Sequence, residues 1–341
     1  MKVLIIAPTV VPLGTGHYGG IELLVSHHLQ GLVDAGDSVT VAAPYGSIVP
    51  SGVKLIETVR LPEEQDREDL AIDAIAHDVV EHAGLQSIGY EVIHDFSHKH
   101  LIGQRGRKIP AVYMMWDPIY FKYPKSTYNI ICLSQWQVDR FELLYNQKAR
   151  LGLTGWIDTK LFKPNDNHRS DRYLFLGKLS QEKGADLALL YAKKLNVPLD
   201  IVGGLIPSEY DSGLRKFLEQ ECRGDIQLHF NVTEEEKLRY LLNCKALIYP
   251  VVQDEAHWLA GIEAWCTDTP TIVMNRGAMS SIMPKQFVAD NEEDFKRKML
   301  NVEVNEQVIE WGKQSRAYYN IEACVKQYRW LYEQVIAGAR W

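Results

Sequence analysis

Several features that would assign this 341-residue chain to a common class of protein are missing from its sequence. No apolar run approaches the roughly 18–20 residues that a membrane-spanning helix needs. Lys and Arg number 37 against 44 Asp and Glu, and this net charge of −7 argues against a nucleic-acid binder, whose affinity depends on neutralising phosphates. The five cysteines contain no C-x-x-C pair, which favours free thiols in a reducing compartment. Residues 1–8 show a strand-like run and no signal-peptide pattern, so we expect a cytoplasmic protein.

Two common catalytic or cofactor-binding motifs are absent or lack their usual context. No G-x-S-x-G segment occurs, so a serine hydrolase has no support. Residues 14–19 match G-x-G-x-x-G, but the preceding strand ends several residues earlier, and the second strand ends without an acidic residue to hold a ribose. We interpret this stretch either as a plain turn or as a glycine loop, with Gly19 and Gly20 opening a helix where the backbone can approach a phosphate.

Short apolar runs alternate with segments of helical period, which predicts an α/β fold with parallel sheets covered on both faces. We expect strands at 3–7, 38–43, 91–94, 111–115, 129–133, 173–176, 199–202, 226–230, 246–249 and 271–273. We expect helices at 21–33, 69–82, 134–145, 185–195, 212–221, 234–242, 259–266 and 324–336. The polar residues 163–171 read as a linker region. The pattern predicts two doubly wound, Rossmann-like domains, 1–152 and 153–321, that face a ligand-binding cleft.

Two lysines flank the predicted turn between the strand at 173–176 and the next helix. Lys178 and Lys183 lie at the carboxyl end of this strand, around the start of the helix. Ligands bind at this end of parallel strands in open α/β sheets. The lysines are therefore candidates for gripping a diphosphate without a metal, and solvated surface lysines are the alternative.

Two glutamates, Glu255 and Glu263, are separated by seven residues. If most of this stretch is helical, the two residues lie about 10–12 Å apart. That is wider than the roughly 5–5.5 Å or 6.5–9.5 Å between the carboxylates of retaining or inverting glycosidases. We expect the two glutamates to contact opposite ends of one long ligand, with the amides of the first helical turn facing an anion between them. A buried Glu263 bonded to the backbone is the alternative.

The strand at 226–230 is followed by a predicted turn around Val232. Thr233 then caps a helix, with Glu236 three residues later, as in a capping box. The exposed turn at Val232 is a candidate for reading a base edge through backbone groups. The strand and loop at 270–277 would close this site.

In this order and at these spacings, the segments resemble the nucleotide-sugar-dependent glycosyltransferases of family 4, which have the GT-B fold. The resemblance covers nearly the whole chain. It rests on residues 18–22, on Ser134 after the strand at 129–133, on residues 155–159 and 177–184, and on the E-x7-E pair of Glu255 and Glu263. It implies a retaining hexosyltransferase that needs no metal or other cofactor. Its donor would be a UDP- or GDP-linked sugar, and its acceptor a glycan, a lipid-linked molecule or a small molecule. It also implies that residues 322–341 cross back onto the first domain.

The resemblance assigns a role to each matching residue. Glu255 would bond the hydroxyls of the transferred sugar, and Glu263 those of the nucleotide ribose. Lys178 and Lys183 would hold the diphosphate and stabilise the leaving nucleotide as its charge grows. The remaining contacts would come from the amides of His257, Trp258, Leu259 and Ala260 at the diphosphate or sugar, from the turn at Val232 at the base, from Gly19 and Gly20 at the phosphates, and from Glu22 at the acceptor.

Two positions depart from the pattern of the family. Lys178 stands where the family usually has arginine, which keeps the charge but loses the bidentate fork. Trp116 stands where many members have a histidine, so Asp117 and His94 become the candidates for the polar group on the acceptor side. In a retaining front-face displacement, the leaving phosphate can take the proton of the acceptor, and no protein base is then required.

Other patterns leave alternatives open. The basic run at 99–108 is typical of a solvated face or of a surface that docks weakly to an anionic, lipid-linked acceptor at a membrane. The histidines at 94, 98 and 100 are interpreted as lining of the cleft and not as a metal site. No Asp-x-Asp triplet occurs, so the metal–diphosphate motif of the other large glycosyltransferase fold is missing. A nucleotide-sugar epimerase or hydrolase of the same fold, or a non-catalytic nucleotide-sugar binding module, are the competing hypotheses.

Overall fold

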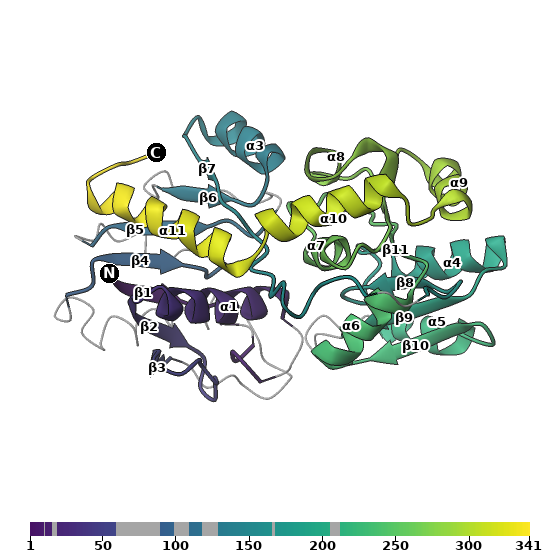
Figure 1. Ribbon diagram of the computed structural model, residues 1–341, viewed down its shortest axis with the longest axis horizontal. Coiled ribbons are helices and arrows are strands. Elements are labelled where there is room, and N and C mark those ends of the chain that lie inside the picture. Colours follow the sequence, from purple (N-terminus) through teal and green to yellow (C-terminus); the bar gives the residue numbers. More distant parts are fainter. Residues whose placement is uncertain are drawn as a thin grey trace. The chain divides into compact units, whose positions relative to one another are not determined.

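The computed structural model describes residues 1–9, 11–15, 19–58, 89–98, 109–117, 129–165, 168–204 and 212–341. The chain divides into two compact units, one formed by Met1–Trp156 with Ile321–Trp341 and the other by Ile157–Asn320 (Figure 1). Each unit is built on one parallel sheet with helices around it, which confirms the predicted α/β fold class. The predicted helix at 69–82 and the basic run at 99–108 lie outside the described residues. Within the described part of the chain, every helix is too short or too polar to cross a bilayer.

The sheet of the first unit has seven strands in the order β3-β2-β1-β4-β5-β6-β7. The elements of this unit are β1 (Lys2–Ile6), α1 (Gly20–Asp34), β2 (Ser38–Ala43), β3 (Lys54–Glu57), β4 (Val92–Asp95), β5 (Ala111–Met114), β6 (Ile130–Cys132), α3 (Gln135–Tyr145), β7 (Arg150–Leu151) and α11 (Ile321–Ile336). All neighbouring strands are parallel, with Val3 opposite Val39 of β2 and Val92 of β4. The strand order reverses between β1 and β4, and this is the topological switch point where doubly wound sheets bind ligands.

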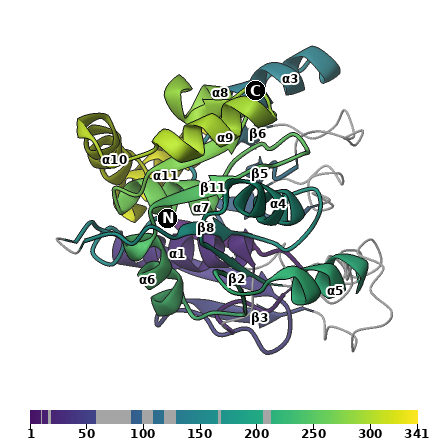
Figure 2. The same ribbon diagram turned by 90° about the vertical axis from the view of Figure 1, so that its right-hand side faces the viewer.

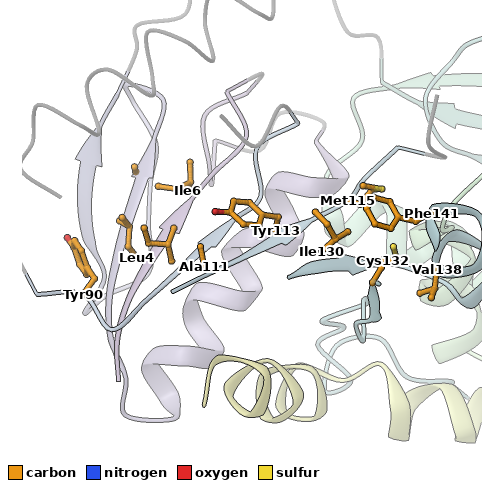
Figure 3. Packing of buried hydrophobic residues seen from close by; sticks show 13 residues of the cluster. Leu4, Ile6, Tyr90, Ala111, Tyr113, Met115, Ile130, Cys132, Val138 and Phe141 are labelled. Carbon is orange, nitrogen blue, oxygen red and sulfur yellow. The ribbon is translucent and has the colours of Figure 1, made fainter. Parts of the chain in front are cut away.

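Apolar side chains pack against both faces of the sheet of the first unit. Helix α11 lies along α1 (Figure 1), and a Cβ added to Gly31 would lie 2.5 Å from Cγ2 of Val325. Because only glycine leaves this space, the two helices can approach each other closely. A separate cluster of buried residues runs from Leu4 and Ile6 of β1 to Val138 and Phe141 of α3 (Figure 3). Alternate residues of β1 therefore serve different parts of the core.

The second unit repeats the strand order of the first, as β10-β9-β8-β11-β12-β13. Its strands are β8 (Tyr173–Leu176), β9 (Leu199–Gly203), β10 (Ile226–Phe230), β11 (Ala246–Tyr249), β12 (Thr271–Met274) and β13 (Val288–Ala289). Its helices are α4 (Ala185–Leu195), α5 (Ser212–Glu221), α6 (Glu234–Asn243), α7 (Leu259–Cys266), α8 (Met279–Ile282), the 3-10 helix η3 (Lys285–Phe287), α9 (Glu292–Asn301) and α10 (Glu306–Tyr318). Figure 2 views this unit from the end that carries α4, α5 and α9. Its switch point lies between β8 and β11, where two chain segments carry the predicted charged residues.

Candidate functional site

The turn after β8 and the loop after β11 contact each other at the switch point of the second sheet. The amide of Val252 donates to the carbonyl of Glu182 at 2.9 Å. Gly184 precedes α4 with a φ of +78°, and a Cβ at this position would lie 2.2 Å from the carbonyl oxygen of Pro250. Only glycine combines this backbone conformation with so close an approach. The turn that carries Lys183 is therefore held against the loop that leads to Glu255.

Glu255 is a buried carboxylate whose side chain and backbone are both fixed. Its Oε1 accepts from Nζ of Lys183 at 2.5 Å, from the hydroxyl of Tyr249 at 3.2 Å and from Nε2 of Gln253 at 3.3 Å. Its carbonyl accepts from the amide of Ala278 at 2.7 Å. Burial first, and then the neighbouring Glu255 carboxylate, raise the pKa of Tyr249 well above its usual value. Tyr249 therefore stays protonated and donates its hydrogen to the glutamate.

Glu263 forms a second lysine–glutamate ion pair, on neighbouring helices. It is buried on α7, and its Oε1 lies 2.5 Å from Nζ of Lys237 on α6. The ammonium of Lys237 also lies 5.2 Å from the ring centroid of Phe162, within the range of a cation–π contact. Lys237 is not predicted from the sequence, because the pair joins residues 26 positions apart whose proximity no local spacing encodes.

The segment between the two glutamates is helical only from Leu259 onward, so the predicted spacing of a mostly helical stretch does not apply. Trp258 is the N-cap residue of α7, and in the described structure no side chain caps this helix end. The indole of Trp258 is buried and stacks on Tyr249, with ring centroids 4.8 Å apart. The side chain of Trp258 thus belongs to the core, and a ligand contact from this residue falls to its backbone at the helix N-terminus.

Two further predicted positions lie at this edge of the second sheet. Lys178 follows β8, and its pKa is lowered, chiefly by burial. Val232 is partly exposed between Asn231, whose φ is +51°, and Thr233. The predicted capping box is confirmed, because the amide of Glu236 donates to Oγ1 of Thr233 at 3.2 Å and the Glu236 carboxylate accepts from the Thr233 amide at 2.8 Å. The turn at Val232 is therefore anchored to the start of α6.

In the first unit, Gly19 and Gly20 open α1 as predicted, with Gly19 as the N-cap residue. The carboxylate of Glu22 folds back over this helix end, because a Cβ added to Gly19 would lie 2.0 Å from Oε2 of Glu22. Burial raises the pKa of Glu22 to about 7, and a backbone hydrogen bond opposes this rise. Near neutral pH this carboxyl group is therefore divided between its neutral and charged forms.

The structure places His94 in the interior of the first unit, not at the acceptor surface for which the sequence proposed it. Its ring is fully buried and stacks on Tyr328, with centroids 5.1 Å apart. Its Nδ1 lies 2.7 Å from the hydroxyl of Tyr332, and this hydroxyl also lies 2.7 Å from Nε2 of His28. The physical reason is that β4 lies inside the sheet and α11 covers it, so the end of this strand is enclosed.

Trp116 and Asp117, the other acceptor-side candidates, are partly exposed after β5. The indole Nε1 of Trp116 donates to the carbonyl of Phe96 at 2.7 Å. The carbonyl of Asp117 accepts from Nε2 of Gln137 at 2.6 Å, which holds the backbone at this position. Among the residues that the structure describes, no group of three or more His, Cys, Asp or Glu side chains is placed to hold a metal ion.

Comparison with known proteins identifies the fold of the chain and the family that its second unit matches. Residues 157–323 match the family described as Glycosyl transferases group 1. No curated protein matches the chain. Among solved structures, sucrose-phosphate synthase from Thermosynechococcus elongatus is 17% identical, with a TM-score of 0.79 and 99% and 100% of the two chains covered. AviGT4, a glycosyltransferase involved in avilamycin A biosynthesis, is also 17% identical, with a TM-score of 0.73 and coverage of 100% and 99%.

A third solved structure, of HepE from Anabaena in complex with UDP, is 12% identical, with a TM-score of 0.71 and 98% and 100% of the two chains covered. At such identities these likenesses show the fold, which is GT-B, and the match of residues 157–323 supplies the type of enzyme. The protein is a glycosyltransferase of the GT-B fold, and residues 157–323, which include its whole second unit, match the glycosyl transferases group 1 family.

Proposed function

We propose that the protein is a retaining, family 4 glycosyltransferase that moves a sugar from a UDP- or GDP-linked donor to an acceptor hydroxyl without a metal. The observation that carries this proposal is that two buried glutamates of the second unit, Glu255 and Glu263, form ion pairs with the partly buried Lys183 and Lys237. Parallel sheets bind ligands at the switch point, where the first of these pairs lies. The structures of HepE with UDP and with UDP-glucose support a donor of this class.

The donor would bind with its two ends at the two glutamates. Glu263 accepts hydrogen bonds from the ribose hydroxyls, and Glu255 accepts hydrogen bonds from hydroxyls of the transferred sugar. Between them, the diphosphate meets Lys178, Lys183 and the uncapped N-terminus of α7. The turn at Val232 contacts the base through its backbone. Each ligand group then meets protein groups of complementary charge or hydrogen-bonding character.

The reaction breaks the bond between the anomeric carbon and the phosphate oxygen of the donor. Negative charge then grows on the leaving diphosphate, and Lys178, Lys183 and the α7 amides stabilise this charge in the transition state. The acceptor hydroxyl attacks the same face of the sugar and forms the new glycosidic bond. Its proton passes to the leaving phosphate oxygen, so that the nucleotide leaves with the proton and no protein base is required.

The acceptor is assigned to the first unit, where Glu22, Trp116 and Asp117 supply polar or aromatic side chains. His94 is not among these groups, since it is enclosed by the core. The half-ionised carboxyl group of Glu22 suits an acceptor hydroxyl, because it can donate or accept a hydrogen bond near neutral pH.

The test measures nucleotide release from UDP- and GDP-linked sugars in the presence of EDTA. The wild-type protein should turn over one of these donors without added metal. Lys183→Met should lower this turnover by about 100-fold, since it removes the ammonium group that stabilises the negative charge on the leaving diphosphate. The matched control is Lys163→Met, a lysine exposed on the surface of the same unit. Loss of turnover in EDTA, or full activity of a folded Lys183→Met protein, would contradict the proposal.

A further inference from the structure

The two glutamates of the second unit are each held through a single carboxylate oxygen. Oε1 of Glu255 accepts from three side chains, whereas Oε1 of Glu263 accepts from Lys237 alone. Within the described ranges of the chain, Oε2 of neither glutamate receives a hydrogen bond. A carboxylate accepts up to about four hydrogen bonds. Each glutamate therefore keeps an oxygen that can bind a ligand hydroxyl.

Lys237 is itself held by contacts within the second unit. Its amide donates to the carbonyl of Thr233 at 2.8 Å, one helical turn after the capping box. Its ammonium lies over the Phe162 ring, and its side chain is only 14% exposed. A side chain that is ordered in the unliganded protein loses little further freedom when the ligand binds. Lys237 thus provides a preorganised anchor for the Glu263 carboxylate.

We infer that Lys237 is a positioning residue that turns Glu263 so that its Oε2 faces the ribose hydroxyls of the donor. This inference rests on the proposed function, in which Glu263 binds the ribose. It distinguishes Glu263 from Glu255, because Glu255 keeps two donors when its lysine is removed and Glu263 keeps none among the described residues.

Helix α6 links this lysine to the proposed base contact. The capping box at Thr233 anchors the turn of Val232, and Lys237 lies one turn further along the same helix. The backbone that would read the base and the cation that orients the ribose-binding carboxylate are therefore parts of one rigid element. Because the ribose is common to UDP and GDP, the effect of Lys237 does not depend on which base the enzyme selects.

The test is a thermodynamic cycle between Lys237 and the ribose hydroxyls. Dissociation constants are measured by calorimetry for UDP, GDP and their 2′,3′-dideoxy analogues, and the base that binds wild-type protein more tightly is used throughout. In the wild type, loss of the two hydroxyls should weaken binding by about 150-fold, which corresponds to two hydrogen bonds to a charged group at the low end of their range. In Lys237→Met this ratio should fall to about threefold or less, and Lys237→Arg should give an intermediate ratio because it keeps the charge.

A merely structural role of Lys237 would weaken the nucleotide and its dideoxy analogue equally. An unchanged ratio in folded Lys237→Met, or in Lys237→Arg if the methionine variant does not fold, would overturn the inference. The matched control is Lys245→Met, since Lys245 also lies over an aromatic ring, 5.3 Å from the centroid of Tyr173, but is outside the proposed site. Failure of the wild type to bind either nucleotide would instead overturn the proposed function, which is a distinguishable result.

Discussion

The two units have the same strand order but use the polar residues near their strand ends differently. In the second unit, Glu255 follows β11 with one oxygen held by Lys183, and its other oxygen receives no hydrogen bond from the described residues. In the first unit, His94 of β4 is bonded to the hydroxyl of Tyr332, which also contacts His28, inside the core. The position of a polar residue at a strand end of a doubly wound sheet is therefore not sufficient evidence of a ligand-binding site. What matters is whether the neighbouring groups leave hydrogen-bonding capacity for a ligand.

The largest effect is expected where the second unit loses a charge from its site. Glu255→Gln should lower kcat/KM by on the order of 100-fold or more, because it removes the proposed hydrogen-bond acceptor for the sugar and leaves Lys183 in a partly buried site without its ion-pair partner. Nucleotide release measures the activity, and circular dichroism checks the fold. Glu303→Gln, at an exposed position of the same unit, serves as the control. Near-normal activity of Glu255→Gln would remove the contrast between the two units.

In the first unit, the ionisation of Glu22 should make the unfolding free energy depend on pH. Its folded pKa of about 7 lies above the ordinary value of 4.5, so the native state holds the proton more tightly than the unfolded state. The stabilisation is complete below pH 4.5 and is lost as the pH rises through 7. Glu22→Gln cannot ionise, so its unfolding free energy should gain about 3 kcal/mol relative to wild type between pH 4 and pH 8.

This measurement compares urea unfolding of the two proteins at each pH. Burial lowers the pKa of His28 to about 3, and this histidine acts in the opposite direction, destabilising the wild type as the pH falls below 6.5. Because both proteins contain His28, its contribution cancels in the difference between them. A difference in unfolding free energy that does not change with pH would show that Glu22 is not buried as described.

A smaller effect on stability is expected from the turn that presents Lys183. Gly184→Ala should destabilise the second unit by at least about 2 kcal/mol, since it adds a clash with the Pro250 carbonyl to the cost of a positive φ. Gly224→Ala is the matched control, because Gly224 has a φ of +62° but nothing within 4 Å of the added Cβ. It should cost about 1 kcal/mol, from the backbone conformation alone. Equal losses of melting temperature in the two variants would contradict the close contact at Gly184.

The smallest effect is expected at the start of α6. Thr233→Ala removes the capping box and should cost about 1 kcal/mol of unfolding free energy. It should also weaken UDP or GDP binding severalfold, because the turn at Val232 loses its anchor. Thermal unfolding and calorimetry measure the two quantities. Stability and affinity that both match the wild type would mean that the capping box does not hold this turn.

Regular apolar patterns in the sequence were sufficient to predict the core strands of both units. The observed bounds of β2, β10 and β11 are those predicted. Strands β7 and β13 have two residues each, which is too short for any periodic pattern. Helices α9 and α10 were not predicted, although their N-caps, Asn291 and Asn305, are typical start signals.

Within the candidate site, the sequence was informative where the arrangement involves residues that are close in the chain. The pair of Glu255 and Glu263 and the capping box at Thr233 are of this kind. Lys237 and the enclosure of His94 depend on contacts between distant segments, and these follow only from the packed structure.

The most direct test of the account is hydrogen–deuterium exchange of the intact protein with and without UDP or GDP. Binding of the nucleotide at the carboxyl edge of the second sheet should slow amide exchange in residues 177–184, 231–237 and 255–263. The strands of the first sheet should keep their exchange rates. Protection that falls outside these three segments, in a protein shown by calorimetry to bind the nucleotide, would contradict the central claim.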